Sequence, residues 1–152
     1  MKSCALRLAL LTAIVVLPVT QLLQLASAFV MEKIGWQPEE ETAVALLAGA
    51  HSWWTHVYIG IFAAAIAPVA EEFIFRGVLY PFVKQLGYPR CAWIGVNALF
   101  AFIHMDAAAL VPLFILALAL TWLYERTDNL LAPIAAHSLF NIAGLIVFYS
   151  VK

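Results

Sequence analysis

Charged side chains are scarce in this sequence. Asp, Glu, Lys and Arg make up 11% of its 152 residues, against roughly 25% in an ordinary soluble domain. The few Lys and Arg residues are scattered, so no basic patch indicates binding to nucleic acid. Hydrophobic residues reach 65%, more apolar surface than a soluble fold of this length can hide, whereas a lipid bilayer accommodates it. The composition therefore predicts an integral membrane protein whose surroundings are the lipid bilayer.

Cysteines and the familiar metal motifs are also scarce. The two cysteines, Cys4 and Cys91, lie far apart in the sequence, which excludes a CxxC-type metal or redox motif. We expect both to be unpaired, buried thiols. The sequence has no HExxH motif, which excludes the zinc-protease helix that this motif marks.

Long apolar runs are what the sequence has in abundance. A helix of roughly 20 apolar residues spans a bilayer, and five runs approach or exceed that length. The predicted fold is an all-α, polytopic transmembrane helical bundle of about five spans, with a core formed by the last four helices. Residues 1–52 are predicted to form an N-terminal transmembrane helix followed by a polar or interfacial loop, and residues 53–152 the membrane core. The five runs cover residues 5–31, 55–82, 91–104, 107–124 and 130–150.

The first run has two interpretations. A basic start, an apolar centre and the small residues of the segment 26–28 are typical of a cleaved signal peptide. The run is longer than an ordinary signal-peptide core and long enough to span a bilayer. We therefore expect a retained helix, with cleavage of residues 1–28 as the alternative.

The basic residues predict the orientation of the chain. With five spans, the loops that carry Lys84, Arg90 and Arg126 fall on the same side as Lys2 and Arg7. Because cytoplasmic loops carry an excess of Lys and Arg, we expect the N-terminus in the cytoplasm and the C-terminus outside.

Three charged residues interrupt the second run, namely Glu71, Glu72 and Arg76. A charge at the centre of a lipid span costs about 2.5–3.5 kcal/mol on translocon-based scales, so these residues need partners or a function. Glu72 and Arg76 are spaced i,i+4 and lie on one helix face, where they can pair. Glu71 points about 100° round the helix from Glu72 and needs a partner from another span.

The later runs offer such partners. His104 ends the third run, and His137 and Asn141 are spaced i,i+4 on one face of the fifth. At about 1.5 Å per residue, Glu71, His104 and Asn141 each lie roughly 20 Å along their helices from charged residues that mark one membrane surface, with His137 about one turn nearer. We therefore expect these four side chains to form one layer.

A layer of this composition can activate water. A carboxylate takes a proton from water, while imidazole and amide groups orient it and stabilise an oxyanion. Two His and one Glu also resemble the ligands of a catalytic zinc ion, so a metal site stays open. The purely structural alternative is a buried Glu72–Arg76 staple, with His137 and Asn141 as hydrogen-bonding contacts between helices.

Three motifs occur in order in separate apolar runs. Residues 67–79, APVAEEFIFRGVL, contain EExxxR followed by Gly; Phe100 to His104 form FxxxH; His137 to Asn141 form HxxxN. Together they resemble the three motifs of the CAAX-protease and bacteriocin-processing family (CPBP, or Abi). The resemblance covers about residues 60–145.

The resemblance implies an intramembrane endopeptidase with a catalytic core of four helices, in the plasma membrane of a bacterium. Its substrate would be a membrane-associated protein or peptide, cleaved in C-terminal sorting-signal or CAAX-like processing. By the matching motifs, Glu71 would activate water, and His104 would assist it. His137 and Asn141 would hold the water or the oxyanion. Glu72 and Arg76 would support the first motif.

Other interpretations stay open at this point. No cofactor is expected, with zinc bound by Glu71, His104 and His137 as the alternative. A non-catalytic bacteriocin self-immunity or membrane scaffold protein would keep the same residues for packing. Buried Glu and His also occur in transporters and proton relays.

Overall fold

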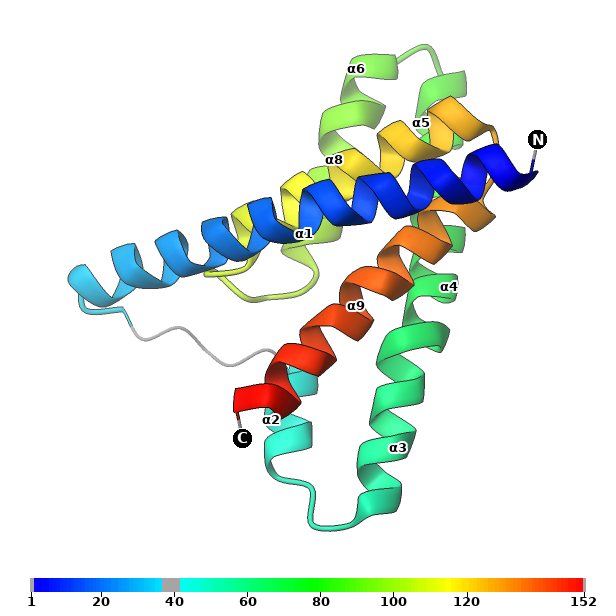
Figure 1. Ribbon diagram of the computed structural model, residues 1–152. Coiled ribbons are helices and arrows are strands. Elements are labelled where there is room, and N and C mark those ends of the chain that lie inside the picture. Colours follow the sequence, from blue (N-terminus) through cyan, green and yellow to red (C-terminus); the bar gives the residue numbers. More distant parts are fainter. Residues whose placement is uncertain (1, 37–41, 152) are drawn as a thin grey trace.

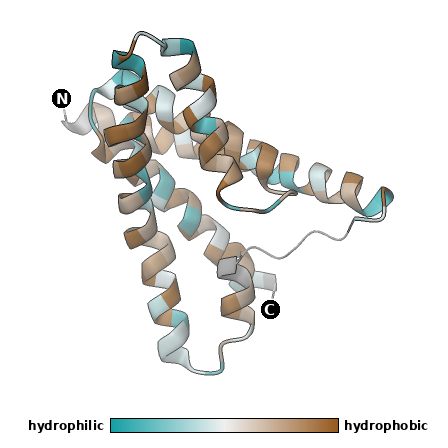
Figure 2. Ribbon diagram, turned by 180° about the vertical axis from the view of Figure 1, so that it is seen from behind, coloured by the Kyte–Doolittle hydropathy of each residue, from teal (hydrophilic) through white to brown (hydrophobic). Residues whose placement is uncertain are grey.

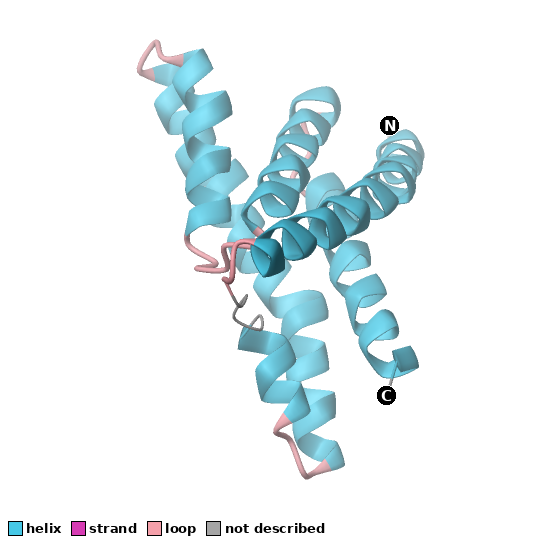
Figure 3. Ribbon diagram, turned by 90° about the vertical axis from the view of Figure 1, so that its left-hand side faces the viewer, coloured by secondary structure: helices cyan, strands magenta, loops and turns pink. Residues whose placement is uncertain are grey.

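The structure, a computed structural model, describes residues 2–36 and 42–151. The predicted all-α class is confirmed: these residues form helices, and no strand occurs among them (Figure 3). Part of the predicted polar loop, residues 37–41, lies outside the described residues. The helices, with η marking π-helical segments, are α1 (Lys2–Lys33), α2 (Thr42–Ala48), α3 (Trp53–Ile61), η1 (Phe62–Ile66), α4 (Ala67–Glu72), η2 (Phe73–Leu79), α5 (Tyr80–Gln85), α6 (Pro89–Cys91), η3 (Ala92–Val96), α7 (Asn97–Phe102), α8 (Leu110–Thr127) and α9 (Leu131–Val151).

Several of these elements are parts of one continuous helix. The segments α3, η1, α4, η2 and α5 follow one another without a break from Trp53 to Gln85. Proline explains two of the π-helical segments, because its ring collides with the carbonyl four residues earlier in a regular helix. For Pro68 and Pro81 those carbonyls belong to Ala64 in η1 and Gly77 in η2, where the wider turn makes room.

Four helices are long and apolar enough to cross a membrane, among the residues that the structure describes. The third predicted run forms a helix of the expected length, but this helix is too short to cross a membrane. It is the continuous helix α6–η3–α7, from Pro89 to Phe102, which rises only about 20 Å against a hydrocarbon core of about 30 Å. The four longer helices are Cys4–Lys33, Trp53–Gln85, Leu110–Thr127 and Leu131–Ser150.

The direction of the helices follows from their contacts. Lys84 of α5 pairs with Glu125 of α8, so α5 and α8 end at the same side of the molecule. Two successive helices that run in the same direction need a segment between them that runs back, and the helix α6–α7 is that segment. The chain therefore makes five passes, of which the third stops partway, and the turn 103–109 lies within the depth of the bundle.

Helix α8 lies between two buried apolar clusters. On one side, α1 lies across α8 and α9, at a large angle to the column of α3 to α5 (Figure 1). On the other, η2 and α7 pack Phe75 and Phe100 against Ala117 of α8. Alanines at these contacts let the helix backbones approach closely. Hydrophobic residues also cover much of the outside of the helices (Figure 2), as expected for surfaces in contact with lipid.

The prediction that the cysteines are buried was wrong. Cys4 and Cys91 are free, as expected, but exposed. Cys4 lies in the first turn of α1 and Cys91 ends α6, and both positions are outside the packed clusters between helices.

Candidate active site

The charges of the second run form a buried ion pair where α4 meets η2. Arg76 Nη1 donates to Glu72 Oε1 at 2.8 Å, and both side chains are 0% exposed. The i,i+4 spacing that predicted this pair therefore holds across the junction. The other carboxylate oxygen of Glu72 is buried without a hydrogen-bond partner among the described residues, so Oε1 makes the contacts of this carboxylate.

Arg76 also binds three groups from neighbouring helices. Its Nη2 donates to the carbonyl oxygen of Ala117 at 2.8 Å and to Asn97 Oδ1 at 3.4 Å, and its Nε donates to Thr121 Oγ1 at 3.3 Å. The guanidinium carbon lies 4.8 Å from the centre of the Phe100 ring, close enough for a cation–π contact. A buried guanidinium thus finds acceptors in α7 and α8 as well as in its own helix.

Sequence reasoning missed Asn97 and Thr121. Both are 0% exposed, but neither carries a charge, and the energetic argument from the sequence used the cost of burying a charge. The available signal was their chemistry: an amide and a hydroxyl inside apolar runs are costly to bury without hydrogen bonds.

His137 links the two carboxylates. Its Nδ1 lies 2.9 Å from Glu72 Oε1, and its Nε2 lies 3.7 Å from Glu71 Oε2. A carboxylate oxygen accepts hydrogen bonds, so Nδ1 carries the hydrogen in this contact and the neutral ring has its lone pair on Nε2. The side chain of Glu71 is 28% exposed, whereas that of Glu72 is 0% exposed. Glu71 is therefore the carboxylate that can be reached from outside.

The remaining predicted residues lie around this centre without a described bond to Glu71. His104 follows α7, and its Nδ1 lies 2.7 Å from the carbonyl oxygen of Phe100. The Phe100 ring packs against both imidazoles, with its centre 4.9 Å from that of His104 and 5.8 Å from that of His137. Asn141 donates from Nδ2 to the carbonyl oxygen of Ala63 in η1 at 2.8 Å.

The structure thus brings together four of the six predicted site residues directly: Glu71, Glu72, Arg76 and His137. His104 joins them through Phe100. Asn141 lies one turn further along α9, where it holds a π-helical carbonyl. The catalytic roles of all six stay predictions.

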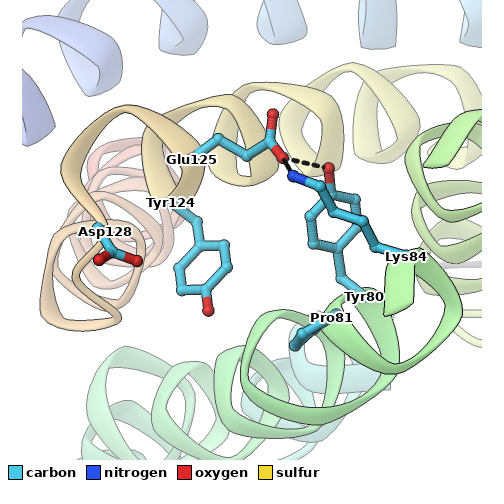
Figure 4. Close-up of a pocket in the computed structure, with 6 residues that line it drawn as sticks. All are labelled: Tyr80, Pro81, Lys84, Tyr124, Glu125 and Asp128. Carbon is cyan, nitrogen blue, oxygen red and sulfur yellow. Dashed lines mark hydrogen bonds and ion pairs between the residues drawn. The ribbon is translucent and has the colours of Figure 1, made fainter. Parts of the chain in front are cut away.

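Two further features bear on ligand binding: the spacing of possible metal ligands and the position of a cavity. In residues 2–36 and 42–151, no three His, Cys, Asp or Glu side chains gather closely enough to hold a metal ion. A cavity of about 350 Å³ lies at the ends of α5 and α8, and neither Glu71 nor Glu72 lines it. Figure 4 shows Glu125 at its edge, bonded to Tyr80 and Lys84.

The arrangement of Glu71 and His137 is suited to holding one water molecule. The carboxylate oxygen and the neutral Nε2 are both acceptors, and at 3.7 Å they are too far apart for a hydrogen bond. A water about 2.8 Å from each could donate one hydrogen to Glu71 and the other to His137. Its oxygen lone pairs would then face away from both groups.

Comparison with known proteins gives the family. The family model described as type II CAAX prenyl endopeptidase, Rce1-like, matches residues 52–143, a range that contains all six predicted site residues. The UPF0177 protein YxdF of Lactococcus lactis subsp. lactis (strain IL1403) is 29% identical over 80 residues, which cover 52% of this chain and 44% of that protein. The match thus spans less than half the length of this relative. No solved structure matches the chain significantly. The chain belongs to the Rce1-like family of type II CAAX prenyl endopeptidases.

Proposed function

We propose that this protein is an intramembrane endopeptidase in which Glu71 activates the water that hydrolyses the peptide bond. One observation carries the proposal: Glu71 Oε2, on a partly exposed side chain, lies 3.7 Å from Nε2 of a histidine whose other nitrogen is held by a buried carboxylate. A general base must be accessible to substrate, and its partner must be oriented. Glu71 and His137 meet these two conditions.

The proposed reaction needs few groups. Glu71 accepts a proton from water as the water oxygen attacks the carbonyl carbon of the substrate, and His137 Nε2 accepts a hydrogen bond from the second hydrogen of that water. The tetrahedral intermediate carries an oxyanion, and we assign its stabilisation to Asn141, whose Nδ2 has a second hydrogen besides the one that it donates to the Ala63 carbonyl. Glu71 then returns its proton to the leaving amine nitrogen as the carbon–nitrogen bond breaks. The atoms and protons balance without a cofactor.

The proposed substrate is the C-terminal segment of a membrane-associated protein or peptide. The family description supports a CAAX-like peptide as the substrate. A C-terminal sorting signal is the other candidate, since it too would be a short segment that enters the bundle from the lipid or the interface. The apolar exterior of the helices supports a substrate that is itself held in the bilayer, which we propose to be a bacterial plasma membrane.

A cleavage assay with protein in liposomes tests the proposal. Glu71→Gln removes the base and is expected to lower kcat by about 10²–10⁴-fold, and His137→Gln is expected to give a loss in the same range. Glu32→Gln is the matched control, because it is the same substitution at an exposed position of α1. All three variants are checked for insertion and thermal unfolding. Cleavage by Glu71→Gln at the wild-type rate would overturn the proposal.

Two alternatives have their own measurements. A non-catalytic scaffold or self-immunity role is supported by the buried contacts of Arg76, and it predicts that Glu71→Gln changes the melting temperature while wild type shows no turnover. A zinc mechanism would use Glu71, His104 and His137. Metal analysis of the purified protein, with a cleavage assay before and after chelation, distinguishes zinc from the metal-free mechanism that we propose.

A further inference from the structure

Polar side chains connect two parallel helices at successive turns. The helix α4–η2–α5 presents a polar residue at every fourth position: Glu72, Arg76, Tyr80 and Lys84. Helix α8 presents their partners at the same spacing: the carbonyl of Ala117 and the side chains of Thr121 and Glu125. The inner contacts join Arg76 to α8, and the outer contacts join Tyr80 and Lys84 to Glu125 (Figure 4). The inner contacts alone reach the candidate active site, through Glu72.

Each hydrogen bond of the inner contacts has one possible direction. Arginine has donors only, so Thr121 Oγ1 and Asn97 Oδ1 must both accept from Arg76. Thr121 therefore uses its single hydrogen toward Asn97 Oδ1, at 2.8 Å. Asn97 Nδ2 in turn donates to the carbonyl oxygen of Trp93 at 2.7 Å. Rotation of the amide by 180° would place its NH₂ group against the guanidinium, so one arrangement of the network is favoured.

This network continues into the imidazole. Arg76 Nη1 and His137 Nδ1 both donate to Glu72 Oε1, at 2.8 and 2.9 Å. The guanidinium thus holds this oxygen in position, and the oxygen in turn determines the orientation of the His137 ring. Because Nδ1 must carry the hydrogen to make its bond, Oε1 also determines which nitrogen of His137 presents a lone pair to Glu71.

We propose that Asn97 and Thr121 are positioning residues for His137. They orient the guanidinium of Arg76, which orients Glu72 Oε1, which keeps the hydrogen of the neutral imidazole on Nδ1. The proposal deepens the proposed function, because it names residues far from the substrate on which the water-holding nitrogen depends. The hydrogen bonds described for these two side chains go to Arg76, to each other and to Trp93, so their effect on His137 passes through Arg76 and Glu72.

Loss of either acceptor releases part of the guanidinium. Without the Thr121 hydroxyl, Nε has no acceptor and Asn97 Oδ1 loses its hydroxyl donor. The guanidinium keeps its Nη bonds to Ala117, Asn97 and Glu72 but is free to tilt at Nε, and Glu72 Oε1 moves with it. His137 can then adopt the tautomer with hydrogen on Nε2, which places a donor toward Glu71 and removes the lone pair that would hold water.

Nitrogen NMR with isotope-labelled histidine tests this directly, in the full-length protein in detergent micelles. The His137 signals are identified by their loss in His137→Gln. In wild type at a pH where the ring is neutral, we expect the hydrogen on Nδ1. Thr121→Val, which replaces a hydroxyl by a methyl group of similar size, is expected to shift the ring to a mixture of both tautomers, and Thr121→Ser to restore the wild-type signal.

The matched control is Thr20→Val in α1. Thr20 is 1% exposed, and its hydroxyl bonds only to its own helix, at the carbonyls of Val16 and Leu17. We expect no change of the His137 tautomer in this variant. Asn97→Leu is a second test of the network, should Thr121→Val fold poorly. A folded Thr121→Val or Asn97→Leu with the wild-type tautomer would overturn the proposal, as would an equal shift in Thr20→Val.

Cleavage kinetics supply a second readout. A displacement of about 1 Å in a catalytic group can cost up to about 100-fold in rate, so Thr121→Val is expected to lower kcat by up to that factor with KM unchanged. The two proposals fail differently. If wild type cleaves no substrate, the proposed function fails while the tautomer measurement still tests Asn97 and Thr121. If Thr121→Val keeps the wild-type tautomer and rate while Glu71→Gln is inactive, the positioning role fails and the proposed function stands.

Discussion

At the residue scale, the polar interior depends on Arg76. Its guanidinium pairs with the Glu72 carboxylate, and the other groups that the guanidinium is described as binding are neutral. Ion pairs in a low-dielectric interior stabilise little over a hydrophobic pair, but removal of one partner leaves the other charge buried and uncompensated. Arg76 and Glu72 should therefore behave as a unit in stability measurements.

We predict that Arg76→Met destabilises the protein by about 3–5 kcal/mol, because the buried Glu72 carboxylate loses its cation. Combining it with Glu72→Gln removes the stranded charge, so the double variant should be more stable than Arg76→Met alone. Thermal unfolding in a mild detergent measures both differences. A double variant that loses the sum of the two single effects would show that the residues act independently.

The residues also show what could be predicted from sequence. Spacing predicted the Glu72–Arg76 pair because i,i+4 contacts are local to one helix. The contact of His137 with Glu71 was predicted only as a shared depth, since which faces meet depends on helix rotation and crossing angle. Asn141 was expected at the same depth, but its amide reaches Ala63, and no sequence rule shows that η1 presents a carbonyl there.

At the element scale, the turn 103–109 is the unusual part of the bundle. Irregular backbone at membrane depth must have its polar groups satisfied within the protein. Asp106, 8% exposed, does this with one oxygen, which accepts from the backbone N–H groups of Ala108 at 2.8 Å and Ala109 at 3.1 Å. The FxxxH motif starts in α7 and ends in this turn, so the geometry of the turn also fixes where His104 lies.

We predict that Asp106→Leu costs about 1–3 kcal/mol of stability, because two buried N–H groups lose their acceptor. Asp106→Asn keeps an acceptor oxygen at the same place and should be close to wild type. Hydrogen exchange of the Ala108 and Ala109 amides gives a local readout, which should accelerate in Asp106→Leu only. Unchanged exchange in Asp106→Leu would mean that other groups satisfy these amides.

The same turn ends the third run. Residues 91–104 are as apolar as a membrane helix but too few to cross a bilayer, and the helix ends two residues earlier than predicted, at Phe102. The stop is made by tertiary structure: Met105 adopts a positive φ of 54°, a backbone conformation uncommon outside glycine and asparagine, and Asp106 binds the backbone beyond it. Neither residue is a strong helix breaker by composition.

At the scale of the whole molecule, the packing brings to one side the basic residues from which the orientation is predicted. Ala9, near the start of α1, packs in one cluster with Leu123, near the end of α8, and Ala132, at the start of α9. Lys84 and Glu125 join the ends of α5 and α8. These contacts place the start of α1 and the ends of α5 and α8 on one side of the bundle, the side that carries Arg7, Lys84, Arg90 and Arg126.

The two native cysteines make this orientation measurable. Cys4 and Cys91 are both exposed, and both lie at the side that carries the basic residues, so the positive-inside rule predicts that both face the cytoplasm. A membrane-impermeant maleimide should label them in inside-out vesicles and leave them unlabelled in right-side-out vesicles. Ser150→Cys in a variant that lacks both native cysteines is the control for the opposite side, because Ser150 is exposed near the end of α9.

Each labelling pattern has a separate meaning. Labelling of Cys4 and Cys91 from the outside would reverse the predicted orientation while leaving the five-pass arrangement intact. Labelling of the two cysteines from different sides would contradict the arrangement itself, because an odd number of crossings would then separate them. With both on the inside, η2 and α5 separate Glu71 from the cytoplasm, since Glu71 lies about 20 Å along the helix from Lys84. We then expect a substrate to reach Glu71 from the lipid or from the outer side.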